Sequence, residues 1–459
     1  SQADEARISL SRALSAKGAK VSHQSIVSAA QQYNPLIHQI LLSCKVQPES
    51  ARLDQRLVFE WKSGMEKDDK EKKSFKSEAL MYELVMSISC EGMGRAGKAC
   101  EDSIAGDFAS ASRELKQAAG VMAFLAEDHL PQWIARGNNV EEKALPSEAS
   151  IGVCDSFKTL LLALGQQMAV ATVLVKKSVP NYTLLAKLSL GIAEYMDLFL
   201  STLRSEASLQ MSRIDPTFFS LLAFQVSLQR GLSYYFLARN SWAEKDYGVA
   251  ISMMKEATPY LRSRSSATAA KGLPPLDSRS GLKALKDDVD ELRSHMGALL
   301  NAYETDNKKV FFDKVPDSVP ENKNLSCGLM MMKAEEYKLE EVEPAPLQVG
   351  PAGGTGKPPT PGEDADRELA RQLQEQMDLE EARGAGSSTS RSSSMSSPPA
   401  PSYDTLMSRP LVPVPVPDVG RPPVPGVDRP PVPGSTQRQK SDEELARELQ
   451  NKLNCGFDG

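Results

Sequence analysis

The sequence predicts an all-α protein, an elongated helical solenoid or bundle with a minor β element near its N-terminus and a disordered, proline-rich C-terminal tail. Three observations support this fold class. Apolar residues recur at helical spacing in about seven long segments. Only one short stretch alternates like a strand, and the composition changes sharply near Pro344. Long helices with short connections favour a helical array over an α/β enzyme fold.

The centre of the array is expected at residues 217–240, which carry almost no charge until their end. Apolar side chains cover two faces of this segment, and a helix that is apolar nearly all round is buried between neighbours. Residues 243–260 return as an amphipathic helix after a short Asn-Ser break. The two segments are therefore predicted to form an antiparallel hairpin.

The remaining elements follow from the same periodicity. Residues 56–61 (RLVFEW) alternate polar and apolar side chains and predict the one strand. Phe75 is the first apolar residue of the helical pattern that follows, and Asp128 to Pro131 is expected to end the helix after that one. Helices are predicted at residues 33–42, 73–88, 108–133, 154–177, 182–209 and 282–303.

The C-terminal part of the chain has a different composition. Of the 30 prolines, 19 lie at or beyond Pro344, together with a serine-rich run at residues 387–397. Such a segment cannot recover its ordering entropy by burial, so an extended tail with polyproline-II tracts is predicted. The helical domain is assigned to residues 1–335 and the tail to residues 336–459, with short helices at 364–382 and 441–453.

Composition and residue spacing favour a binding protein over an enzyme. The net charge of −6 disfavours non-specific nucleic-acid binding. Six cysteines without a C-x-x-C pair favour a reducing, intracellular compartment. Four widely separated histidines predict no metal site. No cofactor motif, catalytic nucleophile motif, signal peptide or transmembrane segment is expected.

The segment GMGRAGK at residues 92–98 fits the spacing of a phosphate-binding loop up to its last position. That position is Ala99, which has no hydroxyl to bind magnesium. The preceding residues have a helical pattern, whereas such a loop must leave a buried strand. The segment is therefore interpreted as a glycine-rich turn between helices.

Three stretches carry a family resemblance. The first is VFEW with SFKSEALMYELVMSISC and FASASRELKQAAGVMAFLAE. The second is the helix pair from Phe219 to Ala257, with Tyr235 and Tyr247 at the expected separation, and the third is DNKKVFFDKVPDSVP at residues 306–320. Together they resemble the Bro1-domain family, which includes Alix and yeast Bro1, over residues 1–335.

The resemblance implies a boomerang-shaped array of helices related to tetratricopeptide solenoids, acting as a non-enzymatic adaptor in endosomal sorting. Such a protein would be cytoplasmic and recruited to endosomes. Its partner would be the amphipathic C-terminal helix of an ESCRT-III subunit, laid in an apolar groove. The family's patch residues fall on Leu228 and Leu232, helped by Leu221 and Phe224, while a further aromatic of the family falls on Asp215 and does not match. The alternative is that these four residues are ordinary core.

Two tail segments, DRELARQLQEQMDLEE and DEELARELQNKL, share the pattern Glu-Leu-Ala-Arg-x-Leu-Gln. On a helix this pattern forms a narrow apolar ridge that is too thin to build a core alone. The ridge is similar to inverted single-helix ubiquitin-interacting motifs, which implies ubiquitin or ubiquitinated cargo as a partner. Solvated helices or short coiled-coil segments are the alternative. The ridge residues are Leu369, Ala370, Leu373, Leu445, Ala446 and Leu449.

The sequence thus predicts an adaptor that docks on ESCRT-III through its helical domain and collects ubiquitinated cargo through its tail. Prolines in the tail suit partners that read proline motifs, such as SH3-type domains. The second interpretation is a generic tetratricopeptide-like scaffold with no link to endosomes.

Overall fold

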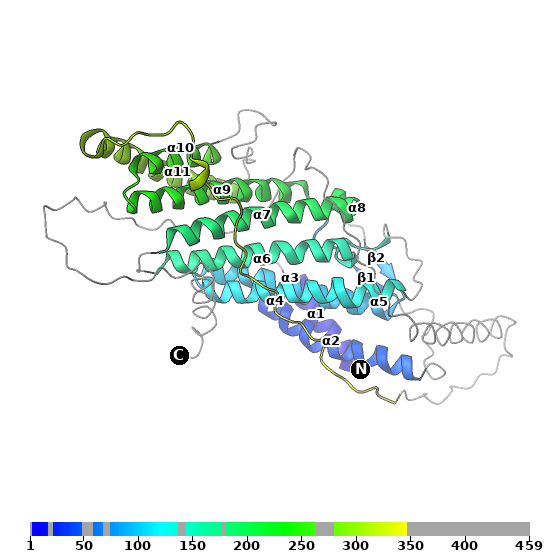
Figure 1. Ribbon diagram of the computed structural model, residues 1–459. Helices are drawn as coiled ribbons and strands as arrows, with labels where there is room; N and C mark the ends of the chain where they lie inside the picture. The colour runs from blue at the N-terminus through cyan, green and yellow to red at the C-terminus, as the bar shows by residue number, and fades with distance from the viewer. Residues whose placement is uncertain are drawn as a thin grey trace, which may run out of the picture. The chain divides into compact units, whose positions relative to one another are not determined.

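Long helices packed side by side form the part of the chain that the computed structural model describes (Figure 1), which is residues 2–16, 22–47, 58–67, 74–135, 144–176, 180–262 and 280–346. The predicted all-α class is confirmed. The α-helices are α1 (Gln2–Ser15), α2 (His23–Val46), α3 (Leu80–Ile104), α4 (Phe108–Phe124), α5 (Leu130–Ala135), α6 (Ile151–Leu174), α7 (Tyr182–Glu206), α8 (Ser208–Arg213), α9 (Pro216–Ala243), α10 (Tyr247–Ala257) and α11 (Ser280–Asp306). Short π or 3-10 turns are η2 (Leu125–His129), η4 (Ser147–Ala149), η5 (Thr258–Leu261), η6 (Asn307–Phe311) and η7 (Glu321–Lys323).

The long helices pack in chain order. Helix α2 lies on α3, α3 on α4, α4 on α6, α6 on α7, α7 on α9, and α9 on α10. One continuous cluster of buried apolar side chains runs through these helices, from Leu10 of α1 to Tyr303 of α11. Each helix therefore buries its apolar residues against two neighbours, as expected of a stacked array.

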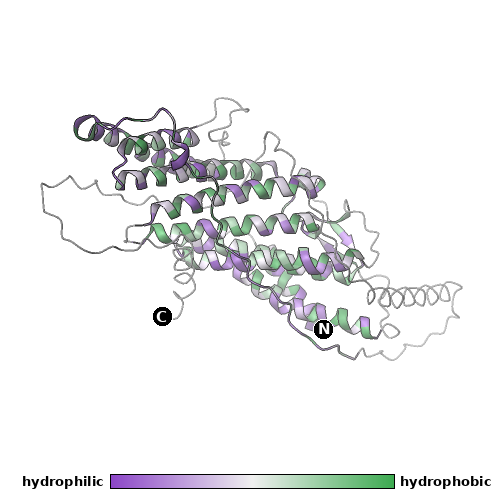
Figure 2. Ribbon diagram, in the orientation of Figure 1, coloured by the Kyte–Doolittle hydropathy of each residue, from purple (hydrophilic) through white to green (hydrophobic). Residues whose placement is uncertain are grey.

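Helix α6 is long and apolar enough to pass a test for membrane spans by length and composition. In the array, 72% of its most apolar window is buried inside the protein. Figure 2 shows the apolar residues distributed along this helix between its neighbours. The apolar composition of α6 is thus accounted for by packing against α4 and α7.

The predicted strand is confirmed at β1 (Phe59–Trp61), but its partner strand was assigned to a helix. Strand β2 (Phe75–Ser77) pairs antiparallel with β1, with Trp61 opposite Phe75. Phe75 therefore begins a strand and not a helical turn, and α3 starts only at Leu80. Three residues are too few for period-2 alternation to stand out from the helical pattern that follows.

Two further local predictions were wrong. GMGRAGK is not a turn, because residues 92–98 lie inside α3, where Gly94 packs on Ile26 and Val27 of α2. Its backbone N–H groups are used by the helix, which excludes a phosphate cradle. Asp128 to Pro131 does not end a helix, because α4 continues through the π turn η2 into α5.

The predicted central hairpin is confirmed. Helix α9 is followed by a tight turn in which Lys245 takes a left-handed backbone conformation with φ of 68°. The backbone N–H of Asp246 closes this turn by donating to the carbonyl of Ser241 at 2.9 Å. Helix α10 then packs back on α9.

An extended segment, residues 324–346, crosses the helices after α11 and is called the C-terminal arm. It runs over the array as the olive and yellow thread of Figure 1. On α7 the backbone N–H of Leu329 donates to the carbonyl of Lys187 at 2.9 Å. On α4 the N–H of Glu335 donates to the carbonyl of Lys116 at 3.2 Å. The arm ends on α2, where the N–H of Ala345 donates to the Ser43 hydroxyl at 2.8 Å.

The arm can approach these helices closely because glycines lie beneath it. A Cβ atom on Gly191 of α7 would lie 2.3 Å from the carbonyl oxygen of Leu329. A Cβ atom on Gly120 of α4 would lie 1.7 Å from the carbonyl oxygen of Glu335. Both distances are far below a van der Waals contact, so any side chain at either position would displace the arm.

Candidate functional site

The start of α9 is fixed by a helix cap. The Asp215 carboxylate accepts a hydrogen bond from the backbone N–H of Thr217 at 2.8 Å and another from the Thr217 hydroxyl. Pro216 occupies the first turn, where a missing N–H costs nothing. Asp215 thus serves the helix N-terminus. The further aromatic residue expected from the family resemblance is absent, and a capping carboxylate occupies its position.

The four predicted partner-binding residues lie in the core of the array. Leu221, Phe224, Leu228 and Leu232 are exposed to solvent by 4%, 0%, 6% and 5%. Helix α9 is packed between α7 and α10 and is apolar on nearly all sides, so its leucines face neighbouring helices. The structure thus places these four residues in the core, which is the alternative interpretation given in the sequence analysis. Direct binding at them stays a prediction, and their burial leaves little surface for a partner.

Phe218, in the first turn of α9, is only half-buried and was not singled out from the sequence. Its ring lies 6.0 Å from that of Phe157 on α6 with the planes 14° apart. It also lies 6.0 Å from Phe199 on α7 at 79°. The signal that could have identified it is the Asp-Pro cap, since a first-turn residue has no preceding helical turn to cover it.

Helix α7 exposes further apolar surface next to Phe199. Leu198 is 48% exposed, and Tyr195 is half-buried. These two residues are three apart and share one face of the helix. We call Tyr195, Leu198 and Phe218 the α7–α9 surface. Tyr195 and Phe218 pack against the core with part of each ring and leave the rest accessible, and Leu198 adds an exposed aliphatic side chain.

An ion pair joins the same two helices. Arg230 Nη2 of α9 lies 2.6 Å from Asp197 Oδ2 of α7. Burial raises the pKa of the Asp197 carboxyl above its ordinary value, and the guanidinium of Arg230 opposes this rise. The pair adds a polar contact between α7 and α9 beside Leu198.

The other predicted site residues are the six ridge residues of the tail, and all lie outside the described residues. Within the described part of the chain, no three His, Cys, Asp or Glu side chains come together in a group that could hold a metal ion.

Comparisons with known proteins agree with this architecture. Residues 2–349 match the family model of the BRO1-like domain. The solved structure "ALIX BRO1 CHMP4C complex" matches with a TM-score of 0.52 and 16% identity, over 74% of this chain and 86% of that chain. "Structure basis for endosomal targeting by the Bro1 domain" matches with a TM-score of 0.52 and 14% identity, over 72% and 82% of the two chains.

A third structure extends the comparison to a longer protein. "Crystal Structure of ALIX in complex with the SIVmac239 PYKEVTEDL Late Domain" matches with a TM-score of 0.53 and 16% identity, over 73% of this chain and 44% of that chain. No curated protein matches the chain. The low identities make these structures guides to the fold alone. The family model spans most of the chain, and the chain therefore belongs to the BRO1-like domain family.

Proposed function

We propose that the chain is a non-enzymatic adaptor in endosomal sorting that docks the amphipathic C-terminal helix of an ESCRT-III subunit. The observation that carries this proposal is the α7–α9 surface, on which Leu198 is exposed and Tyr195 and Phe218 are half-buried. A matched relative of the same fold was solved in a complex with CHMP4C. An amphipathic helix presents apolar side chains at i, i+3, i+4 and i+7, which suits a shallow apolar surface of this kind.

The buried residues of α9 have an indirect role in this proposal. Leu221, Phe224, Leu228 and Leu232 hold α9 between α7 and α10. Phe218, which stacks on Phe157 and meets Phe199 edge-on, is the half-buried anchor on this support. Aromatic anchors at the centre of an interface usually supply most of its binding energy.

The test is a binding titration of the full chain with a fluorescent peptide of the CHMP4C C-terminal helix. Phe218→Ala is expected to weaken binding by about tenfold or more, the usual loss at an aromatic hot spot. Ile104→Ala is the matched control, because Ile104 is 77% exposed at the end of α3 and lies outside the α7–α9 surface. Equal affinities for the two variants would contradict the assigned surface. Failure of wild-type chain to bind peptides from any ESCRT-III subunit would favour the generic scaffold.

We further propose that the tail helices at residues 364–382 and 441–453 bind ubiquitin. The support is the repeated pattern, which places Ala370 and Ala446 inside narrow apolar ridges. Two weak sites on one tether gain affinity through effective concentration. Ala370→Asp combined with Ala446→Asp is expected to abolish capture of diubiquitin, whereas Ala→Gly would also weaken the helices. Undiminished capture by the Asp variant would refute ubiquitin binding by these ridges.

A further inference from the structure

The chain turns after α11 and η6 in a segment that projects an aromatic side chain into solvent. We call residues 308–314 the α11 turn. Phe312 in this turn is 74% exposed, and Val310 is 57% exposed. The turn lies at one end of the array, in the olive coil at the upper left of Figure 1. Large apolar side chains that stay in water forgo the stabilisation that burial would give, so their exposure points to a use outside the core.

The backbone of Phe312 is in the left-handed region, with φ of 58°. This conformation is uncommon for any residue with a side chain, and for a bulky one it is an outlier. Glycine or asparagine would adopt it at a lower cost. A turn alone would therefore be served better by either of these residues, which indicates that the aromatic ring itself is used.

Hydrogen bonds and a ring contact hold the α11 turn in place. The backbone N–H of Phe312 donates to the carbonyl of Asn307 at 2.7 Å. The buried side chain of Asn307 accepts from the N–H of Asp313 at 2.9 Å and donates to the Asp313 carbonyl at 2.9 Å. Phe311 packs inwards, with its ring stacked on that of Tyr247 at 3.6 Å. The turn therefore presents Phe312 without further ordering, and such preorganisation lowers the cost of binding.

Exposed lysines flank the projecting ring on both sides in the sequence: Lys308, Lys309 and Lys314. The one acid of residues 308–314 is Asp313, whose carboxylate accepts a hydrogen bond from the first backbone N–H of α10 at 3.1 Å. With the exposed Asp317 included, residues 308–317 still hold three lysines against two aspartates. The α11 turn is therefore basic.

Carboxylates of the neighbouring elements are paired with cations of their own. Asp246, at the start of α10, lies 2.9 Å from Nζ of Lys323. Glu304, near the end of α11, lies 2.8 Å from Nζ of Lys255. These pairs offset the two acids locally, so they reduce the attraction on the basic α11 turn only weakly.

A lipid bilayer suits the α11 turn better than a protein does. A stable protein interface buries about 800 Å² on each partner around an apolar centre, and lysine is depleted there. A bilayer requires only a projecting apolar side chain that enters the interface. Lysine side chains at its surface extend their ammonium groups to anionic headgroups. One projecting ring among lysines matches the second description.

We propose that the α11 turn docks on a bilayer that contains anionic lipid, with Phe312 inserted into the headgroup region and Val310 beside it. The lysines of the turn lie at the level of the lipid phosphates and add electrostatic attraction. This surface is separate from the α7–α9 surface, so membrane binding here does not depend on the adaptor function.

The first experiment measures cosedimentation of the full chain with phosphatidylcholine vesicles that contain or lack phosphatidylserine. Phosphatidylserine is expected to strengthen binding about tenfold or more, because each lysine near an anionic surface adds to the attraction. Phe312→Asn should weaken binding to these anionic vesicles about tenfold, since asparagine tolerates the left-handed backbone and removes the ring. Ile134→Asn is the matched control and should bind like the wild-type chain, because Ile134 is 57% exposed on α5, outside the turn.

The second experiment tests insertion of the ring. On binding to the anionic vesicles, Phe312→Trp is expected to add tryptophan emission that shifts to shorter wavelength and is quenched by lipids brominated on their acyl chains. The wild-type chain supplies the background from its own tryptophans, and Ile134→Trp should show neither effect.

Three results would overturn the proposal. The first is equal binding of the wild-type chain to both kinds of vesicle, or binding to neither, which would favour an acidic protein as the partner. The second is an equal loss of binding in Phe312→Asn and Ile134→Asn. The third is emission of Phe312→Trp that brominated lipids do not quench, because the ring would then stay outside the bilayer.

Discussion

The rings of Phe157 and Phe218 stack with their centroids 6.0 Å apart and their planes 14° from parallel. This contact joins the first turn of α9 to α6, two positions away in the helix order. Phe218 is half-buried, whereas Leu228 on the same helix is fully packed. Truncating each residue should therefore lower the free energy of unfolding by different amounts, and this difference distinguishes a binding role from a structural one.

Leu228→Ala is expected to lower the free energy of unfolding by about 2–5 kcal/mol, since it leaves a cavity between packed helices. Phe218→Ala should cost clearly less, because part of its ring already contacts solvent. Chemical denaturation followed by circular dichroism measures both. Equal losses would show that Phe218 is as much a core residue as Leu228, and would weaken its assignment as an anchor.

Gly191→Ala is expected to detach the C-terminal arm from α7, because the new methyl would lie 2.3 Å from the Leu329 carbonyl oxygen. Amide hydrogen exchange should then accelerate at Leu329, whose N–H is bonded to Lys187. Gly165→Ala on α6 is the matched control, because its nearest neighbour would lie at an ordinary 3.6 Å. Similar exchange in the two variants would mean that the arm yields without detaching.

Tyr33→Phe is expected to destabilise the N-terminal helices by about 1.5–3 kcal/mol, the value of a hydrogen bond to a charged group. The Tyr33 hydroxyl donates to Glu83 Oε1 at 2.8 Å, and Glu83 is 0% exposed. Arg7 and Trp61 also donate to this carboxylate, at 2.8 and 2.5 Å. Urea denaturation measures the loss of stability. An unchanged midpoint would show that Arg7 and Trp61 satisfy the Glu83 carboxylate without the Tyr33 hydroxyl.

Glu148→Gln is expected to change the pH dependence of stability. Because burial raises the pKa of Glu148 above 4.5, the folded state holds this proton more tightly than the unfolded chain. The stability that Glu148 contributes to the folded state is therefore fully present below pH 4.5. It is lost as the pH rises through the pKa of Glu148 in the folded state. Melting temperatures across this range should shift in favour of the Gln variant as the pH rises. Glu127→Gln, on a side chain that is 62% exposed, is the surface control.

The helices were predictable because their apolar stripes are long. Residues 217–240 and 243–260 signalled α9 and α10 through periodicity and a short break. The β2 strand was hidden, because Phe75 also fits the spacing of the helix that follows it. The glycines of residues 92–98 look like a turn in the sequence, but inside α3 they provide room for α2.

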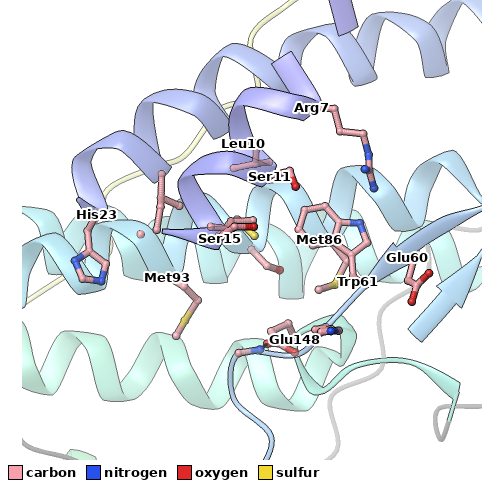
Figure 3. Close-up of a pocket in the computed structure, with 17 residues that line it drawn as sticks. Arg7, Leu10, Ser11, Ser15, His23, Glu60, Trp61, Met86, Met93 and Glu148 are labelled. Atoms are coloured by element: carbon pink, nitrogen blue, oxygen red, sulfur yellow. Dashed lines mark hydrogen bonds between the residues drawn. The ribbon is translucent and has the colours of Figure 1, made fainter. Parts of the chain in front are cut away.

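The site was less predictable than the fold. A leucine stripe has the same appearance whether it faces a neighbour or a partner, so the pattern around Leu228 could not separate core from surface. Phe218 and Phe219 are neighbours in the first turn of α9, but they lie on different sides of the helix, so Phe219 is buried and Phe218 is only half-buried. A cavity lined in part by Glu148 (Figure 3) brings together residues of α1, α2, β1, α3 and η4, and no local sequence pattern predicts that these elements meet.

The C-terminal arm also brings the end of the described chain to α2. Its last described contacts are with Ser43 and Gln47, at the other extreme of the helix order from Phe218. Through its backbone hydrogen bonds the arm thus links α7, α4 and α2, three helices that are separated along the chain.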